Sequence, residues 1–366
     1  MSTQLRILTS GNLNFLAYAQ GILDGADVAL KKTTSVTYVD QDTGRKLVIA
    51  GTGFDFQDTG PQAVPFGAQV APIAGTVTSV TLMHGSVKVA EITGFAADLT
   101  FVAAVLQNGT FQTFLYTLEE LQGPITFRGN NGKDVLPGTF GDDTYDGGRG
   151  GDTFNGDSGL DTVSYLSSTA GLTASLAKPS LNTGDAAHDI YHDIENLSGS
   201  KFRDHLTGNS SANGLIGAAG NDVLHGGGGD DSVQGSAGAD TVYGDAGNDS
   251  LGGGKGADLL IGGAGADAFV FDTPFDGVDK VSTFDSLDGV FISRTGFNLG
   301  PRATFDFKSS NNPHATTDDP TFLYDKNDKN FSFDPDGTGA VKAVTLFHIN
   351  GAGAVQESDI HLFFPA

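Results

Sequence analysis

An apolar residue recurs every nine residues through the middle of the chain, in two runs that cover residues 129–164 and 199–270. Each of the twelve units begins with glycine, and its eighth residue is always apolar. The sixth residue is aspartate in eleven units, with Asn213 as the exception, and the fourth is glycine in ten, with Phe202 and Ser211 as exceptions. A fixed short period is typical of solenoids, in which each coil buries its apolar face against the next.

Each unit divides into a turn and a strand. Glycine at the first and fourth positions permits positive φ and lets backbone carbonyls approach one another without a Cβ in the way. The last three residues form a short strand whose middle side chain faces the core. Two units make a coil of 18 residues, and stacked coils build two parallel sheets. The sequence therefore predicts a mainly β protein with a parallel β-roll over residues 126–270, in which residues 165–198 form a larger coil or an insertion.

The regions on either side of the repeats lack the nine-residue period and have other patterns of polar and apolar residues. Between residues 1 and 125, alternating stretches at 34–39, 46–56, 75–85 and 86–94 predict strands, the last two as a hairpin. Residues 97–109 and 113–123, each closed by glycine, predict short helices. We expect a small N-terminal α+β domain there, and a β-rich C-terminal cap over residues 271–366.

The aspartates at the sixth position stack on one edge when coils of 18 residues are superimposed. Between them lies a pocket of carboxylate and backbone carbonyl oxygens, which is the donor set that Ca²⁺ prefers. Stacked pairs of aspartates predict about seven or eight calcium ions at such sites. The candidate metal ligands are Asp134, Asp143, Asp152, Asp161, Asp204, Asp222, Asp231, Asp240, Asp249, Asp258 and Asp267. The sites around residues 199–216 are doubtful, because Asn213 lacks the charge and two permissive glycines are missing.

These units resemble the RTX repeats of hemolysin-type calcium-binding proteins, whose pattern is G-G-x-G-x-D-x-U-x. The unit GGAGADAFV at residues 262–270 fits every position of that pattern, and residues 266–285 resemble the segment that caps such repeats. The resemblance implies a calcium-dependent β-roll and export through a type I secretion apparatus with an uncleaved C-terminal signal. It also implies a secreted, extracellular or cell-surface location.

The excess of acidic residues favours a cation as the binding partner. The chain carries 44 acidic against 20 basic residues, a formal net charge of −24, so it repels nucleic-acid phosphates. It has no cysteine, which excludes disulfides and thiolate metal sites. We expect no membrane span, because no apolar run is long enough, and no cleaved signal peptide in the first 21 residues.

Three further motifs suggest other chemistry, and each has a simpler interpretation. GDSG at residues 156–159 is similar to a serine-protease nucleophile loop, yet it opens a repeat unit, so Ser158 is not assigned a catalytic role. His188 and His192 are spaced as on a metal-binding helix, but we expect a surface loop. DPDGTG at 334–339 predicts a tight turn, with an extra calcium site at Asp334 and Asp336 as the alternative.

The favoured function is a non-enzymatic, secreted protein whose roll folds when it binds calcium outside the cell and displays or assembles its flanking regions. Self-assembly or a cell-surface ligand would be its further partner. The alternative is a secreted hydrolase or adhesin whose activity lies in residues 1–125. No catalytic residue is assigned, because that region carries no nucleophile-elbow, zinc or paired-acid signature.

Overall fold

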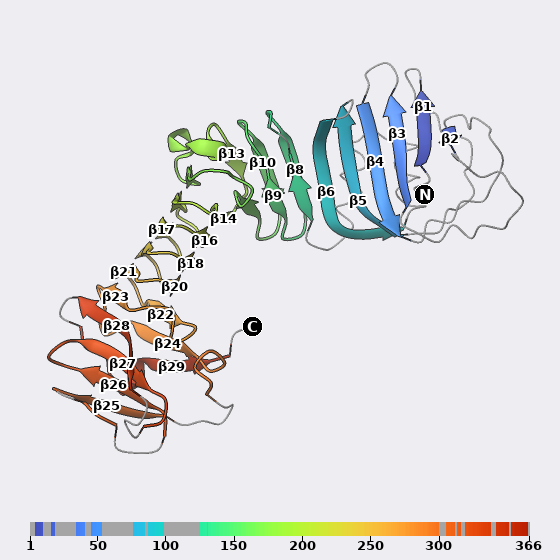
Figure 1. Ribbon diagram of the computed structural model, residues 1–366. Helices are drawn as coiled ribbons and strands as arrows, with labels where there is room; N and C mark the ends of the chain where they lie inside the picture. Colours follow the sequence, from blue (N-terminus) through green and yellow to red (C-terminus); the bar gives the residue numbers. More distant parts are fainter. Residues whose placement is uncertain are drawn as a thin grey trace, which may run out of the picture. The chain divides into compact units, whose positions relative to one another are not determined.

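The computed structural model describes six strands by their backbone within residues 4–98, and it describes residues 125–364 apart from 130, 300–304, 312, 316–318, 338–341 and 351–352, with the side chains of 137 and 139 also left out. The chain divides into two compact units (Figure 1). The first contains residues 1–163 and 190–194, and the second contains residues 164–189 and 195–366.

The first unit changes from antiparallel to parallel pairing along one sheet. Strands β3 to β6 pair antiparallel in sequence order, and β6 pairs antiparallel with β7. From β7 onward the pairing with β9 and β11 is parallel, and β8, β10 and β13 form a separate parallel sheet. The strands are β1 (Gln4–Thr9), β2 (Leu16–Tyr18), β3 (Thr34–Asp40), β4 (Arg45–Thr52), β5 (Thr76–His84), β6 (Val87–Asp98), β7 (Thr126–Arg128), β8 (Val135–Thr139), β9 (Thr144–Asp146), β10 (Thr153–Asp157), β11 (Thr162–Ser164) and β13 (Ile190–His192).

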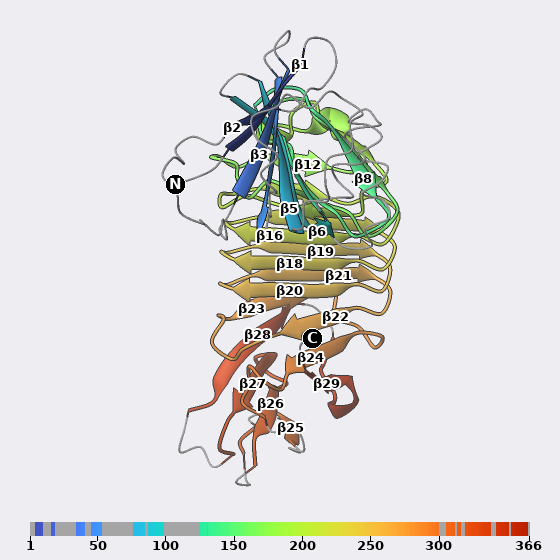
Figure 2. The same cartoon turned by 90° about the vertical axis from the view of Figure 1, so that its right-hand side faces the viewer.

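The second unit is built around the parallel roll that the repeats predict. Alternate strands β14, β16, β18, β20, β22 and β24 form one sheet, and β12, β15, β17, β19, β21 and β23 form the other (Figure 2). The roll strands are β12 (Thr173–Ser175), β14 (Asn196–Ser198), β15 (His205–Thr207), β16 (Gly214–Ala219), β17 (Val223–Gly228), β18 (Ser232–Ala237), β19 (Thr241–Ala246), β20 (Ser250–Lys255), β21 (Leu259–Ala264), β22 (Ala268–Phe271), β23 (Asp279–Ser282) and β24 (Gly289–Ser293).

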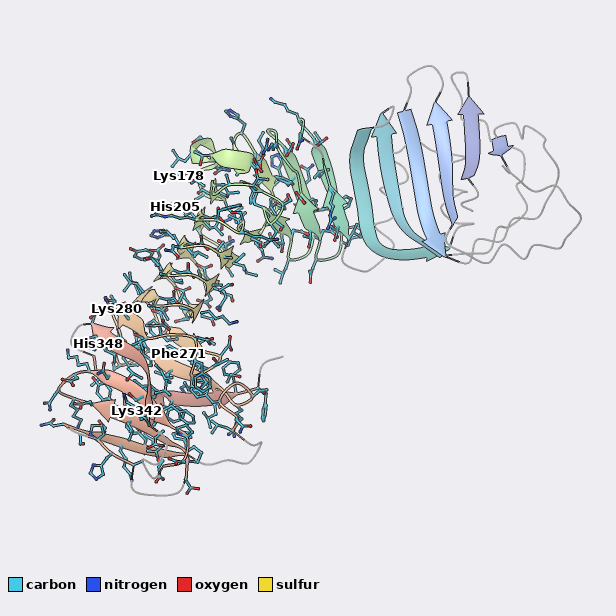
Figure 3. The ribbon with its side chains drawn as sticks, viewed as in Figure 1. Lys178, His205, Phe271, Lys280, Lys342 and His348 are labelled. Atoms are coloured by element: carbon cyan, nitrogen blue, oxygen red, sulfur yellow. The ribbon has the colours of Figure 1, made fainter. Side chains whose placement is uncertain are left out.

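The core of the roll consists of the eighth-position residues. Leu206 pairs with Leu224, which pairs with Val242 in the next coil of the same sheet, and all three are fully buried. The side chains on either side point outward: His205, labelled in Figure 3, is exposed next to buried Leu206. Each buried leucine stabilises the fold by about 1.5–3 kcal/mol. The period-nine pattern therefore predicts the core correctly.

A cap of strands follows the roll in the second unit. Strand β28 (Val344–Asn350) pairs parallel with β23 and antiparallel with β27 (Asn330–Asp334), which continues to β26 (Thr321–Asp325) and β25 (Asp306–Ser310). Strand β29 (Ile360–Phe363) pairs parallel with β24. Phe271, at the end of the repeats, stacks on Phe347 of β28 with ring centroids 4.8 Å apart. Aromatic packing thus joins the cap to the last coils.

Several local predictions are tested by these strands. The hairpin predicted at 75–94 is confirmed as β5 and β6. Ala97 and Asp98, where a helix was expected to begin, instead end β6; the rest of both predicted helices lies outside the described residues. The loop expected at His188–His192 is wrong in part, because Ile190–His192 form β13 and pair with β10. Nowhere in the described part of the chain does a helix have the length and hydrophobicity to cross a bilayer.

Candidate metal centre

The turns of the roll owe their shape to the glycines. In the unit that starts at Gly235, the fourth residue, Gly238, has φ +153° and passes so close to the carbonyl oxygen of Gly220 that no Cβ would fit. A Cβ on Gly235 would lie 2.5 Å from Oδ2 of Asp240 and 2.8 Å from the carbonyl oxygen of Gly253. Glycine therefore keeps open a space between one carboxylate and a carbonyl of the next coil.

The sixth-position aspartates form a continuous ladder through their Oδ1 atoms. The backbone N–H of Asp222 donates to Oδ1 of Asp240 at 2.8 Å, and that of Asp240 donates to Oδ1 of Asp258 at 2.8 Å. The same bond recurs along the other edge from Asn213 to Asp231, and from Asp231 to Asp249. These bonds fix each carboxylate against the preceding coil, so the sequence-predicted ligands are brought together as expected.

The second carboxylate oxygen is buried in the turn without a hydrogen-bond partner. This holds for Oδ2 of Asp222, Asp231, Asp240, Asp249, Asp258 and Asp267. A buried carboxylate oxygen that no donor meets is costly, because it loses its bonds to water and gains nothing in return. A cation placed against it would supply the missing partner.

Burial raises the pKa of these carboxyl groups. The pKa of Asp222 rises from 3.8 to about 7, chiefly by desolvation and secondarily through the charges of Asp240 and Asp204. The pKa of Asp231, of Asp258 and of Asp267 rises to about 6, again chiefly by desolvation. The fold therefore holds carboxylates in surroundings that disfavour their charge.

The donor set fits Ca²⁺. Each turn offers carboxylate and backbone carbonyl oxygens and no nitrogen or sulfur ligand, as hard cations prefer. Among the residues that the structure describes, no three His, Cys, Asp or Glu side chains converge closely enough to hold a metal ion by themselves. A calcium ion would therefore be held by aspartates 18 residues apart together with backbone carbonyls such as that of Gly253, and its charge would neutralise the buried carboxylates.

The first run of repeats has the same ladder. Oδ1 of Asp143 accepts the N–H of Ile125 at 2.9 Å, Oδ1 of Asp152 accepts that of Asp134 at 2.9 Å, and Oδ1 of Asp161 accepts that of Asp143 at 2.8 Å. Asp143, Asp152 and Asp161 are buried, whereas Asp134 is partly exposed. Ile125 lies nine residues before Asp134, at the sixth position of the same register in the sequence.

Two sixth positions differ from the rest. Both oxygens of Asp204 are hydrogen-bonded within the protein, Oδ1 to the N–H of Leu172 and Oδ2 to the N–H and hydroxyl of Ser200. At the neighbouring position, the Nδ2 group of Asn213 donates to the carbonyl of Glu195 at 2.8 Å. The doubt that the sequence raises about residues 199–216 thus coincides with a real structural difference.

Sequence reasoning missed two members of the ladder, Asp279 and Asp288. Oδ1 of Asp279 accepts the N–H of Asp258 at 3.0 Å, and Oδ1 of Asp288 accepts that of Asp267 at 3.0 Å. Both are buried, and both lie 21 residues after their partner instead of 18. A three-residue insertion in the coil after Val270 hides them, although a valine still follows each aspartate by two residues.

The remaining sequence candidates take up ordinary structural positions. Ser158 is exposed in a turn whose Asp161 belongs to the ladder. Oδ1 of Asp334 accepts the N–H of Asp336 at 3.3 Å and of Gly337 at 3.1 Å, which is the predicted tight turn. His188 is exposed beside β13, so the helical spacing considered for it does not form.

Comparison with known proteins identifies the repeats. A family model for the RTX calcium-binding nonapeptide repeat matches in four copies, at residues 128–163, 193–224, 216–251 and 251–272. The search of curated proteins finds no match. The solution structure of the AlgE6R3 subunit from the Azotobacter vinelandii mannuronan C5-epimerase is similar over 44% of this chain and 78% of that one, with 25% identity and a TM-score of 0.25. Residues 128–163 and 193–272 of this chain are therefore RTX calcium-binding nonapeptide repeats arranged in a parallel β-roll.

Proposed function

We propose that the chain is a secreted protein whose roll becomes stable when calcium binds outside the cell. The observation that carries this proposal is the set of buried Oδ2 atoms without partners in the turns of residues 217–270. Without a cation these carboxylates oppose folding, and with one they hold adjacent coils together. A chain with a net charge of −24 also repels itself until cations neutralise it.

The magnitudes suit a switch between a low-calcium and a high-calcium compartment. Extracellular calcium modules bind at roughly 10⁻⁴–10⁻³ M. Each filled site stabilises the fold by about 1.4 kcal/mol when calcium is ten times Kd. Several sites along one ladder then add up to a large part of the stability of an ordinary domain. The proposal therefore includes export as a loose chain through a type I apparatus, as the resemblance to RTX proteins implies, followed by folding outside the cell.

We further propose a structural or interaction role for the folded protein, in which the roll displays the regions on either side. None of the observations on the described residues favours a hydrolase. In the alternative function, as an adhesin or an enzyme, the activity would lie in residues 1–125. The repeats supply the calcium response in either case.

The deciding experiment is a calcium titration of the full chain, with far-UV circular dichroism and light scattering recorded together. We expect a cooperative gain of β signal between chelator and millimolar calcium, with no gain from equal magnesium. The variant Asp240→Asn should raise the calcium midpoint at least tenfold, because this residue is shared by two pairs, whereas Asp230→Asn, at an exposed neighbouring carboxylate, should not. Constant mass would support display by a monomer, and rising mass would support assembly. An unchanged β signal would overturn the proposal.

A further inference from the structure

We propose that residues 165–189 and 195–216, called here the hydrogen-bonded section, fold without calcium and form the nucleus on which residues 217–270, the open-carboxylate section, are built. This inference goes beyond the proposed function, and it rests on that proposal only for the calcium dependence of the open-carboxylate section. Its basis is that the side chains of Asp189, Asp204 and Asn213, which are buried in this section, each accept a hydrogen bond from a protein donor.

The first such position is Asp204. Its Oδ2 accepts the N–H of Ser200 at 2.6 Å and the hydroxyl of Ser200 at 2.9 Å. The equivalent oxygen of Asp222, one coil later, has no such bond. Ser200 is itself fully buried, and its hydroxyl lies closer to the two carboxylate oxygens of Asp204, at 3.0 and 2.9 Å, than to the carbonyl oxygen of Phe202, at 3.4 Å. The serine therefore fills the place that a cation fills in the later coils.

The second position is Asn213. Its Oδ1 accepts the N–H of Asn209 at 2.7 Å, and its Nδ2 donates to the carbonyl oxygen of Glu195 at 2.8 Å. The side-chain N–H group of Asn213 therefore donates to a carbonyl oxygen of the preceding coil, where an aspartate would have no donor. The amide also removes the buried charge that an aspartate would bring there. Adjacent coils are thus joined by a neutral side chain.

The third position is Asp189, which closes the large loop of this section. This carboxylate is 2% exposed, and its Oδ2 accepts the hydroxyl of Tyr165, also buried, at 2.7 Å. The loop is further fastened to the coils by backbone bonds from Leu176 to Thr207 and from Tyr165 to Ser198. Buried Asn182 receives the N–H of Ser175 at 2.8 Å. The long insertion is consequently an ordered, internally bonded part of the roll.

The backbone changes at the boundary between the two sections. In the open-carboxylate section the second residue of each unit has positive φ, for example +81° at Ser236 and +72° at Asp245. Strands β17 to β21 there have six residues each. Ser200 and Asn209 are not in this conformation, and their N–H groups turn toward the sixth-position side chain. Strands β14 and β15 stop after three residues. Turn conformation and donor supply therefore change together.

The hydrogen-bonded section also presents strand edges on which the next coils of the roll can pair. Strand β14 pairs with β16, and β15 pairs with β17, both in parallel register. The N–H of Asp204 donates to Oδ1 of Asp222, which places the first open carboxylate against a coil that is already formed. Each later coil then needs only to close on an existing edge, which lowers the entropic cost of starting the roll.

Hydrogen exchange read by mass spectrometry on the full chain, in chelator and in millimolar calcium, tests this inference. We expect peptides from 165–189 and 195–216 to stay protected in chelator, while peptides from 217–270 exchange freely and become protected in calcium. Equally free exchange of both sections in chelator would overturn the inference and leave the proposed function standing. Protection of both sections in chelator would instead contradict the proposed function.

Two variants examine the donors themselves. Tyr165→Phe and Asn213→Asp should each raise exchange in the hydrogen-bonded section at least tenfold in chelator. Calcium should restore protection in Asn213→Asp, because the new carboxylate joins the ladder with Asp231. Tyr243→Phe and Asn221→Asp, at side chains that reach solvent, are the matched controls and should leave exchange unchanged. Wild-type exchange in both variants would overturn the role given to these donors.

Discussion

The hydrogen-bonded section and the open-carboxylate section share the same kind of core and differ in their turns, both in backbone conformation and in the partners of the sixth-position side chain. Leu206 and Leu215 in the first are fully buried, as are Leu224 and Leu251 in the second. At the sixth position, Oδ2 of Asp204 has two donors from Ser200 and Oδ2 of Asp222 has none. Hydrophobic packing therefore specifies the roll in both sections, while the partners of the sixth-position side chains decide whether a section depends on calcium.

The largest effects should come from truncating this shared core. Leu206→Ala and Leu251→Ala each remove a fully buried side chain, which costs about 2–5 kcal/mol. Leu206→Ala should lower stability in chelator and in calcium alike, because the hydrogen-bonded section exists in both. Leu251→Ala should be partly rescued by raising calcium. Denaturant unfolding at several calcium concentrations measures both, and equal rescue of the two variants would erase the distinction between the sections.

Much of the structure that the two sections share can be predicted from the sequence. Glycine at the first position, aspartate at the sixth and an apolar residue at the eighth predict the coil, the aspartate ladder and the core, respectively. Asp279 and Asp288 escape the pattern because three inserted residues shift the spacing from 18 to 21. The donors to Asp189 and Asp204 escape it for another reason. Tyr165 lies 24 residues from its acceptor, and the Ser200 hydroxyl acts only because the local turn directs it inward.

The next effect is a pH dependence of the metal-free chain. Burial raises the pKa of Asp222 to about 7 and of Asp258 to about 6, whereas unfolded aspartates titrate near 3.9. Between these values the folded chain keeps protons that the unfolded chain has released, so stability falls as pH rises. The stabilisation that these carboxyl groups give to the folded, metal-free chain is complete below about pH 4 and is lost above about pH 7.

Far-UV circular dichroism of the full chain in metal-free buffer should therefore show more β signal at pH 5 than at pH 8, because only the protonated carboxyl groups let the open-carboxylate section fold without calcium. In saturating calcium the trend should reverse, because protons compete with the cation for the same carboxylates. A metal-free β signal that rises with pH would mean that these oxygens are not desolvated in the folded chain.

A smaller, more local effect should follow from filling the space beside one carboxylate. In Gly235→Ala the new Cβ would lie 2.5 Å from Oδ2 of Asp240, and in Gly199→Ala it would lie 2.6 Å from Oδ2 of Asp204. The first change should raise the calcium midpoint about tenfold, equivalent to about 1.4 kcal/mol. The second should cost stability without changing the calcium midpoint. Calorimetric titration and denaturant unfolding separate the two results, and an altered midpoint in Gly199→Ala would place calcium at Asp204 after all.

The smallest effect concerns the outer edge of the turn, at Asp245. Its Oδ2 lies 3.0 Å from Nδ1 of His225, and both side chains are 39% exposed, so the pair contributes little. Asparagine tolerates the positive φ found at this residue, so Asp245→Asn should keep the backbone. The charge of Asp245 does add to the raised pKa of Asp231 and of Asp249, but burial is the main cause for both. We therefore expect a stability change below about 0.5 kcal/mol and a calcium midpoint within twofold of wild type. A larger shift of the midpoint would show that second-position side chains take part in binding, and the calcium dependence would then not be decided by the sixth-position side chains alone.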